Sequence, residues 1–191
     1  MKIKYDLEPR EYFIDPMNST DNENIIQLKL GIDWYRDKWE SEDRHNIVQI
    51  GNVLGMYGYC ESNTVELSKF KDDNSIEKGF AGTIDYYDDF KDYDFTGKAV
   101  ISLEAFNRNE YNFELLTKIT NEASSYFITF TPNSNSDLDS QIIMELEKWQ
   151  WHGWCRKDQS TWEYSAQRPD VWEKERNSPN PAANGIILIH S

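Results

Sequence analysis

The densest group of charged side chains in the sequence is a ten-residue segment that mixes carboxylates with aromatic rings. Residues 85–94 contain five aspartates and one lysine. Carboxylates this close repel one another and call for a positive partner, while tyrosines supply contact area at low entropic cost. We therefore predict a partner-binding surface made by Asp85, Tyr86, Tyr87, Asp88, Asp89, Asp92, Tyr93 and Asp94. A solvated loop or hairpin tip is the alternative interpretation.

The same carboxylates could also bind calcium, and their spacing tests this. Asp92, Asp94 and Gly97 have the spacing of the first part of an EF-hand loop. The third ligand position lacks an acid, and position 12 of such a loop would be Leu103 instead of a glutamate. The sequence therefore predicts no calcium site, and no metal elsewhere.

A second unusual feature is the tryptophan-rich stretch from Lys148 to Arg176, which holds five of the seven tryptophans. Exposed tryptophans can stack on sugar rings, so Trp151, Trp154 and Trp162 form an alternative ligand-binding platform, as in a carbohydrate-binding module. The competing interpretation is that these large rings are buried and join a helix to a sheet.

Sequence motifs for catalysis are missing. The chain has no GxSxG, P-loop, GxGxxG or HExxH pattern. His152 and Cys155 lie three positions apart but lack the second pair of a zinc site. We therefore expect no catalytic residues and no cofactor, and an enzyme is disfavoured. A small hydrolase with two carboxylates facing each other in a cleft is a third hypothesis.

Composition narrows the class of partner. The 191 residues include 34 acidic and 20 basic side chains, a formal net charge of −14. This charge repels nucleic acids and anionic membranes and attracts a basic protein surface. No apolar run approaches the roughly 20 residues of a membrane-spanning helix, and the first residues lack a secretory signal. Cys60 and Cys155 show no disulfide pattern. We therefore expect a cytoplasmic protein.

The pattern of apolar residues predicts mostly strands up to about residue 131. Alternation or β-branched and aromatic runs indicate strands at 1–7, 26–34, 47–50, 65–67, 80–87, 99–106, 111–119, 126–130 and 185–189. Strands at this spacing favour antiparallel sheets in a sandwich or barrel. Leu138, Ile142, Leu146 and Trp149 predict one helix, with a strand over 142–151 as the alternative. A larger helical share would make the fold α+β.

These observations combine into a single domain over residues 1–191. We expect a β-rich acidic core over 1–131, with the tryptophan-rich segment 132–191 docked on it. In general character the chain resembles small inhibitory proteins, such as immunity proteins and phage-encoded inhibitors. The leading hypothesis is a binding protein that covers the positive surface of a basic, nucleic-acid-acting partner (a toxin, nuclease or defence enzyme). The alternative is a carbohydrate-binding β-sandwich module.

Overall fold

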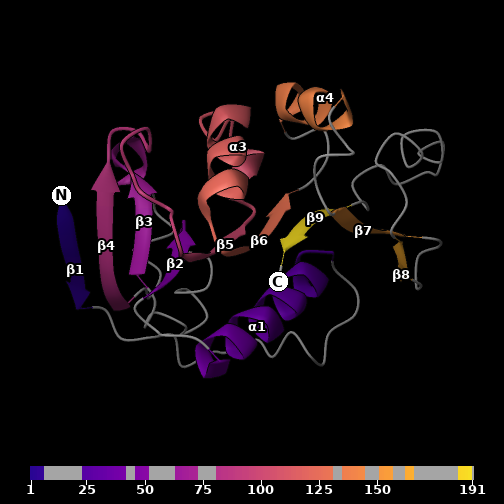
Figure 1. The fold of residues 1–191 in the computed structure, drawn as a ribbon, viewed down its shortest axis with the longest axis horizontal. Coiled ribbons are helices and arrows are strands. Elements are labelled where there is room, and N and C mark those ends of the chain that lie inside the picture. Colours follow the sequence, from indigo (N-terminus) through magenta and orange to yellow (C-terminus); the bar gives the residue numbers. More distant parts are fainter. Residues whose placement is uncertain are drawn as a thin grey trace.

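The described part of the chain forms one nine-stranded sheet with helices on both faces (Figure 1). The computed structural model describes residues 1–6, 23–41, 46–51, 63–72, 81–130, 135–144, 151–156, 162–165 and 185–190. The strands are β1 (Lys2–Asp6), β2 (Ile47–Ile50), β3 (Asn63–Leu67), β4 (Ala81–Tyr87), β5 (Ala99–Leu103), β6 (Ser125–Phe130), β7 (Trp151–Arg156), β8 (Trp162–Ser165) and β9 (Gly185–His190). The α-helices are α1 (Glu23–Ser41), α3 (Phe113–Glu122) and α4 (Ser136–Met144), and the short 3-10 helices are η3 (Ser68–Phe70) and η5 (Ala105–Asn107).

The middle of the sheet is parallel and its two sides are antiparallel. The strand order is β1-β4-β3-β2-β5-β6-β9-β7-β8. The five strands from β4 to β6 in this order pair in parallel. β1 pairs antiparallel with β4, β9 antiparallel with β6, and β7 antiparallel with β9 and β8. Parallel neighbours need a connection that crosses a face of the sheet, and α3 provides it between β5 and β6.

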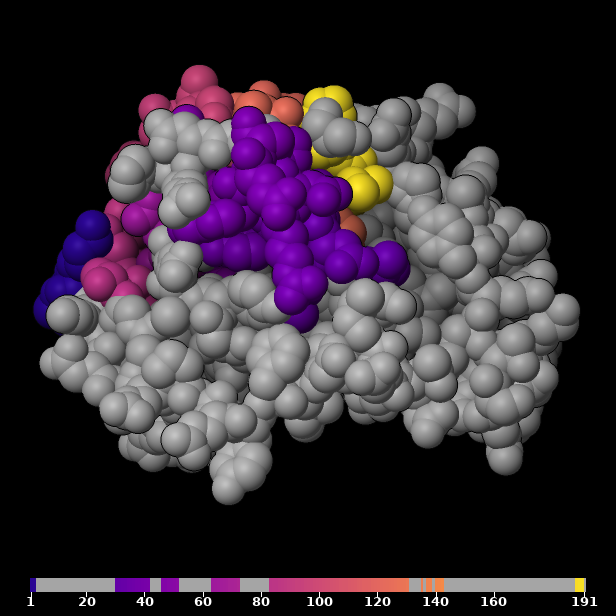
Figure 2. Space-filling model, turned by 90° about the horizontal axis from the view of Figure 1, so that it is seen from below, coloured from indigo at the N-terminus to yellow at the C-terminus, as the bar shows by residue number. Residues whose placement is uncertain are grey.

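One face of the sheet packs against α1. Ile32 and Tyr35 of this helix are buried in a cluster with Ile101 and Phe127 of the sheet. Figure 2 views this face and shows α1 lying across it. Burying such a stripe of large side chains supplies most of a helix's stability in a protein.

The other face packs against α3 and α4. Leu116 and Ile119 of α3 and Ile142 of α4 are fully buried, in one cluster with Val100 and Ile128 of the sheet. The Asn112 side chain caps α3 by accepting a hydrogen bond from the Leu115 N–H at 3.0 Å. The apolar spacing and the cap together fix where this helix begins and which side faces the sheet.

The predicted antiparallel sandwich or barrel is wrong, because the chain forms a single α/β sheet with a parallel centre. Residues 26–34, predicted as a strand, belong to α1, and most of 111–119 belongs to α3. Apolar residues at every second position in 26–34 also recur four apart, which suits a helix. In β2, β5 and β6 every side chain is buried, the pattern of strands covered on both faces.

The single helix predicted over 138–149 is only part of the helical content. α4 spans Ser136–Met144 and buries Leu138 and Ile142, whereas Leu146 and Trp149 lie outside the described residues. Within the part of the chain that the structure describes, no helix is long and apolar enough to cross a membrane.

The close approach of α1 to β5 gives a test of this packing. A Cβ atom added at Gly31 would lie 2.8 Å from Cδ2 of Leu103 and 3.4 Å from Cε1 of Phe127. We expect Gly31→Val to lower the free energy of unfolding by about 1–3 kcal/mol, since the buried neighbours must move. Asp37→Val at an exposed position of the same helix is the control, and it should cost less than about 0.5 kcal/mol. Equal effects in urea unfolding would contradict the packing.

Candidate functional site

The candidate site lies where the parallel strands end. Because they run in the same direction, their carboxyl ends meet at one edge of the sheet. β3 and β4 lie on one side of β2, whereas β5 and β6 lie on the other. This is the strand order of a Rossmann-like sheet, and the chain reverses its direction of travel between β2 and β5. Open α/β sheets bind ligands in the crevice at such a switch point.

Gly51 follows β2 directly and marks the centre of this edge. Its φ angle of 80° lies in the left-handed region, where any other residue would be strained. Its N–H donates to the Val65 carbonyl oxygen at 3.0 Å. A Cβ atom at this position would lie 3.7 Å from the Cβ of Ala105 and 3.8 Å from Oε2 of Glu66. Gly51 therefore lies between Ala105, which comes after β5, and Glu66, near the end of β3. These are the two strands that flank β2.

Glu66 places a buried carboxylate at the carboxyl end of β3. The residue is 6% exposed. Its Oε1 accepts a hydrogen bond from the Leu67 N–H at 2.9 Å and a second from the Tyr111 hydroxyl. A buried carboxylate is tolerated only where donors satisfy it, and these two donors hold the group in place.

Glu104 follows β5 on the other side of the switch point. Its φ angle of 63° is the one positive value among the described non-glycine residues. Its N–H donates to the Thr129 carbonyl oxygen at 3.0 Å, and its Oε2 accepts a hydrogen bond from Nδ2 of Asn107. A non-glycine residue in this conformation costs energy and is typical of functional sites.

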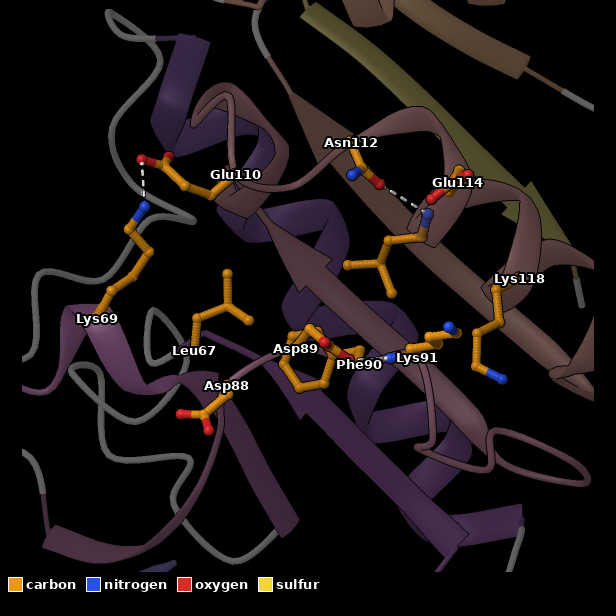
Figure 3. A pocket seen from close by; sticks show the side chains of 11 residues that line it. Leu67, Lys69, Asp88, Asp89, Phe90, Lys91, Glu110, Asn112, Glu114 and Lys118 are labelled. Carbon is orange, nitrogen blue, oxygen red and sulfur yellow. Dashed lines mark hydrogen bonds and ion pairs between the residues drawn. The ribbon is translucent and has the colours of Figure 1, made fainter.

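A cavity of about 700 Å³ lies between the end of β3, the segment after β4 and the start of α3 (Figure 3). Leu67, Phe90 and Leu115 are its buried apolar residues. The other residues that line it are polar or charged: Lys69, Asp88, Asp89, Lys91, Glu110, Asn112, Glu114 and Lys118. The cavity has the size of a small-molecule site, with an apolar part for a ring and polar groups around it.

Ion pairs organise part of the polar side of the cavity. Lys69 pairs with Glu110 at 3.1 Å, as Figure 3 shows, and Lys118 pairs with Glu122 at 2.7 Å. The backbone N–H of Glu110 and then the Lys69 ammonium hold the pKa of the Glu110 carboxyl below its usual value. Both signs of charge therefore line the cavity, which suits a ligand that is polar but not strongly anionic.

Comparisons with known proteins give distant structural similarity only. No family model and no curated protein matches the chain. The chain is similar to magnesium protoporphyrin IX methyltransferase (ChlM) from Synechocystis PCC 6803 with bound SAM, at 11% identity and a TM-score of 0.39, over 91% of this chain and 86% of that one. It is also similar to the plantazolicin methyltransferase BpumL in complex with a triazolic desmethylPZN analog and SAH, at 11% identity and a TM-score of 0.46, over 93% and 88%.

The ChlM structure with bound SAH gives a TM-score of 0.36 at 11% identity, over 91% of this chain and 90% of that one. This likeness is distant. The assignment of a Rossmann-like sheet rests on the strand order and directions described above.

The tyrosines of the predicted partner surface point into the fold. Tyr86 is 2% exposed, and Tyr87 and Tyr93 pack against the buried cluster with ring centroids 5.2 Å apart. Phe90 and Phe95, from the same segment, are buried as well. The rings therefore anchor the segment to the sheet, with Tyr86 buried and Tyr87 and Tyr93 partly buried, and the partner-binding surface stays a prediction.

The aspartates of the segment lie on its outer side. Asp88, Asp89, Asp92 and Asp94 are exposed, and Asp88 and Asp89 line the cavity. Asp85 is half-buried beside the N-terminal amine, 3.4 Å away. The Thr96 hydroxyl and N–H donate to Asp94 and lower the pKa of its carboxyl.

The interpretation of the chain as an inhibitor that occludes a basic partner is wrong. The described residues form a Rossmann-like α/β sheet and not the antiparallel β fold that this interpretation assumed, and Tyr86, one of its expected contact residues, is buried. The expectation of a basic protein partner is a separate statement and stays a prediction.

The carbohydrate-binding β-sandwich interpretation is wrong too, because β7 and β8 continue the same α/β sheet. Trp151 and Trp154 lie on β7 and Trp162 on β8, and their side chains are outside the described residues.

Sequence reasoning missed Gly51, Glu66 and Tyr111, which the structure brings together at the strand ends, and Glu104, which follows β5. One signal was available. A glycine directly after an apolar strand, followed by an acid at the end of the next strand, is the spacing logic of a Rossmann-type site. Tyr111 lies 45 positions from Glu66, and no local pattern joins them.

The inward packing of Tyr87 gives a test by pH. Burial, and then the hydrogen bond to Asp85, raise the pKa of Tyr87 from 10.0 to about 12. A raised pKa stabilises the fold below pH 10, and this contribution disappears as the pH rises from 10 to 12. We expect the phenolate absorbance of wild type minus Tyr87→Phe to titrate with a midpoint near 12. A midpoint near 10 would show an exposed ring instead.

Proposed function

We propose that this chain binds a ribose-bearing nucleoside cofactor at the carboxyl edge of its parallel strands and acts on a substrate with it. The observation that supports this most is the Glu66 carboxylate, buried at the end of β3 next to the switch point. In Rossmann-type sites an acid in this position accepts hydrogen bonds from the ribose hydroxyls. The earlier expectation of no cofactor came from the missing motifs alone.

The direction of the carboxylate suits this role. Oε1 accepts hydrogen bonds from Leu67 and Tyr111, whereas Oε2 lies 3.8 Å from the Cβ position of Gly51. Gly51 has no side chain, so a ligand can approach the backbone at the end of β2 closely. A ribose in the crevice would therefore meet Oε2 over this glycine.

The neighbouring cavity suits the base of such a ligand. Leu67 connects the two places, because its N–H donates to Glu66 and its side chain lines the cavity. Leu67, Phe90 and Leu115 supply apolar contacts for a planar ring, and Asp88 and Asp89 supply acceptors for exocyclic amines. The volume of about 700 Å³ lies within the range of small-molecule sites, roughly 300–1,000 Å³.

SAM and SAH are the probes to use first, since the similar structures hold them and both contain ribose and adenine. If the chain binds them, methyl transfer is the reaction class that this proposal assigns. SAM would supply a methyl group on a sulfonium, which a nucleophile of the substrate can take. The chain's own residues would bind the ribose at Glu66 and hold the base in the cavity.

We predict that wild-type protein binds SAH and that Glu66→Gln binds it at least ten-fold more weakly. The amide keeps the size of the side chain but loses the charged acceptor, and a charge-assisted hydrogen bond is worth about 1.5–3 kcal/mol. Isothermal titration calorimetry measures both affinities, with thermal melts to confirm folding.

Asp92→Asn is the matched control, because Asp92 is exposed and lies outside the residues that line the cavity. It removes the same charge and should leave the affinity within about two-fold, since exposed charges contribute little. Absence of SAH binding by the wild-type chain, or equal affinities for wild type and Glu66→Gln, would contradict the proposal.

A further inference from the structure

Tyr111 is one of the residues that hold the Glu66 carboxylate in place. It is fully buried, and its hydroxyl donates to Oε1 of Glu66. The same oxygen accepts the Leu67 N–H. Two donors on one oxygen fix the rotation of the carboxylate, and the other oxygen then faces Gly51.

The ring of Tyr111 packs between three aromatic side chains. Phe70 of η3 stacks on it with centroids 5.9 Å apart and planes 9° apart. Phe106 of η5 meets it edge-on at 5.7 Å, and Phe90 lies 6.4 Å away. The Arg108 guanidinium lies 4.1 Å from the Phe70 ring centre and covers it. Such a packed ring has one orientation for its hydroxyl.

The backbone around Tyr111 is held by Asn135, which lies in the connection between β6 and α4. Nδ2 of Asn135 lies 3.2–3.3 Å from the carbonyl oxygens of Phe106, Arg108 and Tyr111. Oδ1 of Asn135 accepts the Leu138 N–H at the start of α4. The loop after β5 is therefore fixed to the start of α4.

We propose that Tyr111 is a positioning residue for the ligand site: it holds Glu66 by Oε1 so that Oε2 is presented to a ribose hydroxyl at the end of β2. This inference rests on the proposed function. A glutamate side chain is flexible, and holding it before the ligand arrives removes a cost of binding. Tyr111 itself does not touch the ligand, so its effect passes through Glu66.

The test uses SAH and the analogue of SAH that has 2′-deoxyribose, titrated into the full chain by calorimetry. Wild type should prefer SAH. We expect Tyr111→Phe, which keeps the ring, to bind SAH about ten-fold more weakly and to lose most of the preference for ribose. Tyr126→Phe is the control, because Tyr126 is another buried tyrosine, on β6, and it should leave both unchanged.

A double-mutant cycle separates positioning from general destabilisation. In the Glu66→Gln background, Tyr111→Phe should weaken SAH binding no further. Urea unfolding of the same four proteins without ligand should show that the two changes are not additive, which reports their contact directly.

Three outcomes would overturn the inference. One is a wild-type preference for ribose that Tyr111→Phe retains, and another is tighter SAH binding by this variant, as expected if the hydroxyl competed with the ligand. Additive losses of affinity in the cycle are the third. If wild type binds neither compound, the proposed function itself fails, and the inference fails with it.

Discussion

The parallel pairing of the central strands is the constraint on which the rest of the described structure depends. Parallel strands cannot be joined by tight turns, so each connection must cross a face of the sheet and cover it. α3 does this between β5 and β6, and α1 covers the opposite face. The same constraint brings all five carboxyl ends to one edge. Gly51, Glu66 and Ala105, which end or follow three different strands, lie close together there for this reason.

The positions of several strands could be predicted from the sequence, but not their direction. The ranges 47–50, 99–106 and 126–130 contain all of β2, all of β5 and most of β6. These strands are buried along their whole length, as in a parallel sheet, whereas an antiparallel sheet with one solvent-exposed face alternates. The corresponding sign in the sequence is an apolar run without strict alternation. The alternation in 26–34 was misleading, since apolar residues at even positions also satisfy a spacing of four. Because residues 26–34 and 111–119 were predicted as strands, the prediction contained no helices between the strands, and the α/β class was therefore missed.

The candidate site could not be predicted because contacts between distant residues create it. Charge density drew attention to residues 85–94, where the tyrosine rings pack against the core and, of the residues predicted to bind a partner, Asp88 and Asp89 line the cavity. Glu66 is one of 34 acids and has no local mark except its place at the end of a strand. Its partner Tyr111 is 45 positions away, and Asn135 is 24 positions beyond that. Composition measures how many acids a chain has, whereas burial decides which acid matters.

Three local departures from the most stable choice coincide at this edge of the sheet. Gly51 and Glu104 both have left-handed backbone, which costs glycine little and a glutamate roughly 1–2 kcal/mol. Glu66 buries a carboxylate where an apolar side chain would avoid the cost of desolvation. Each departure alone could be a structural detail. Their concentration at the switch point of a parallel sheet, beside a cavity of ligand size, is the pattern expected where function and not stability has determined the residues.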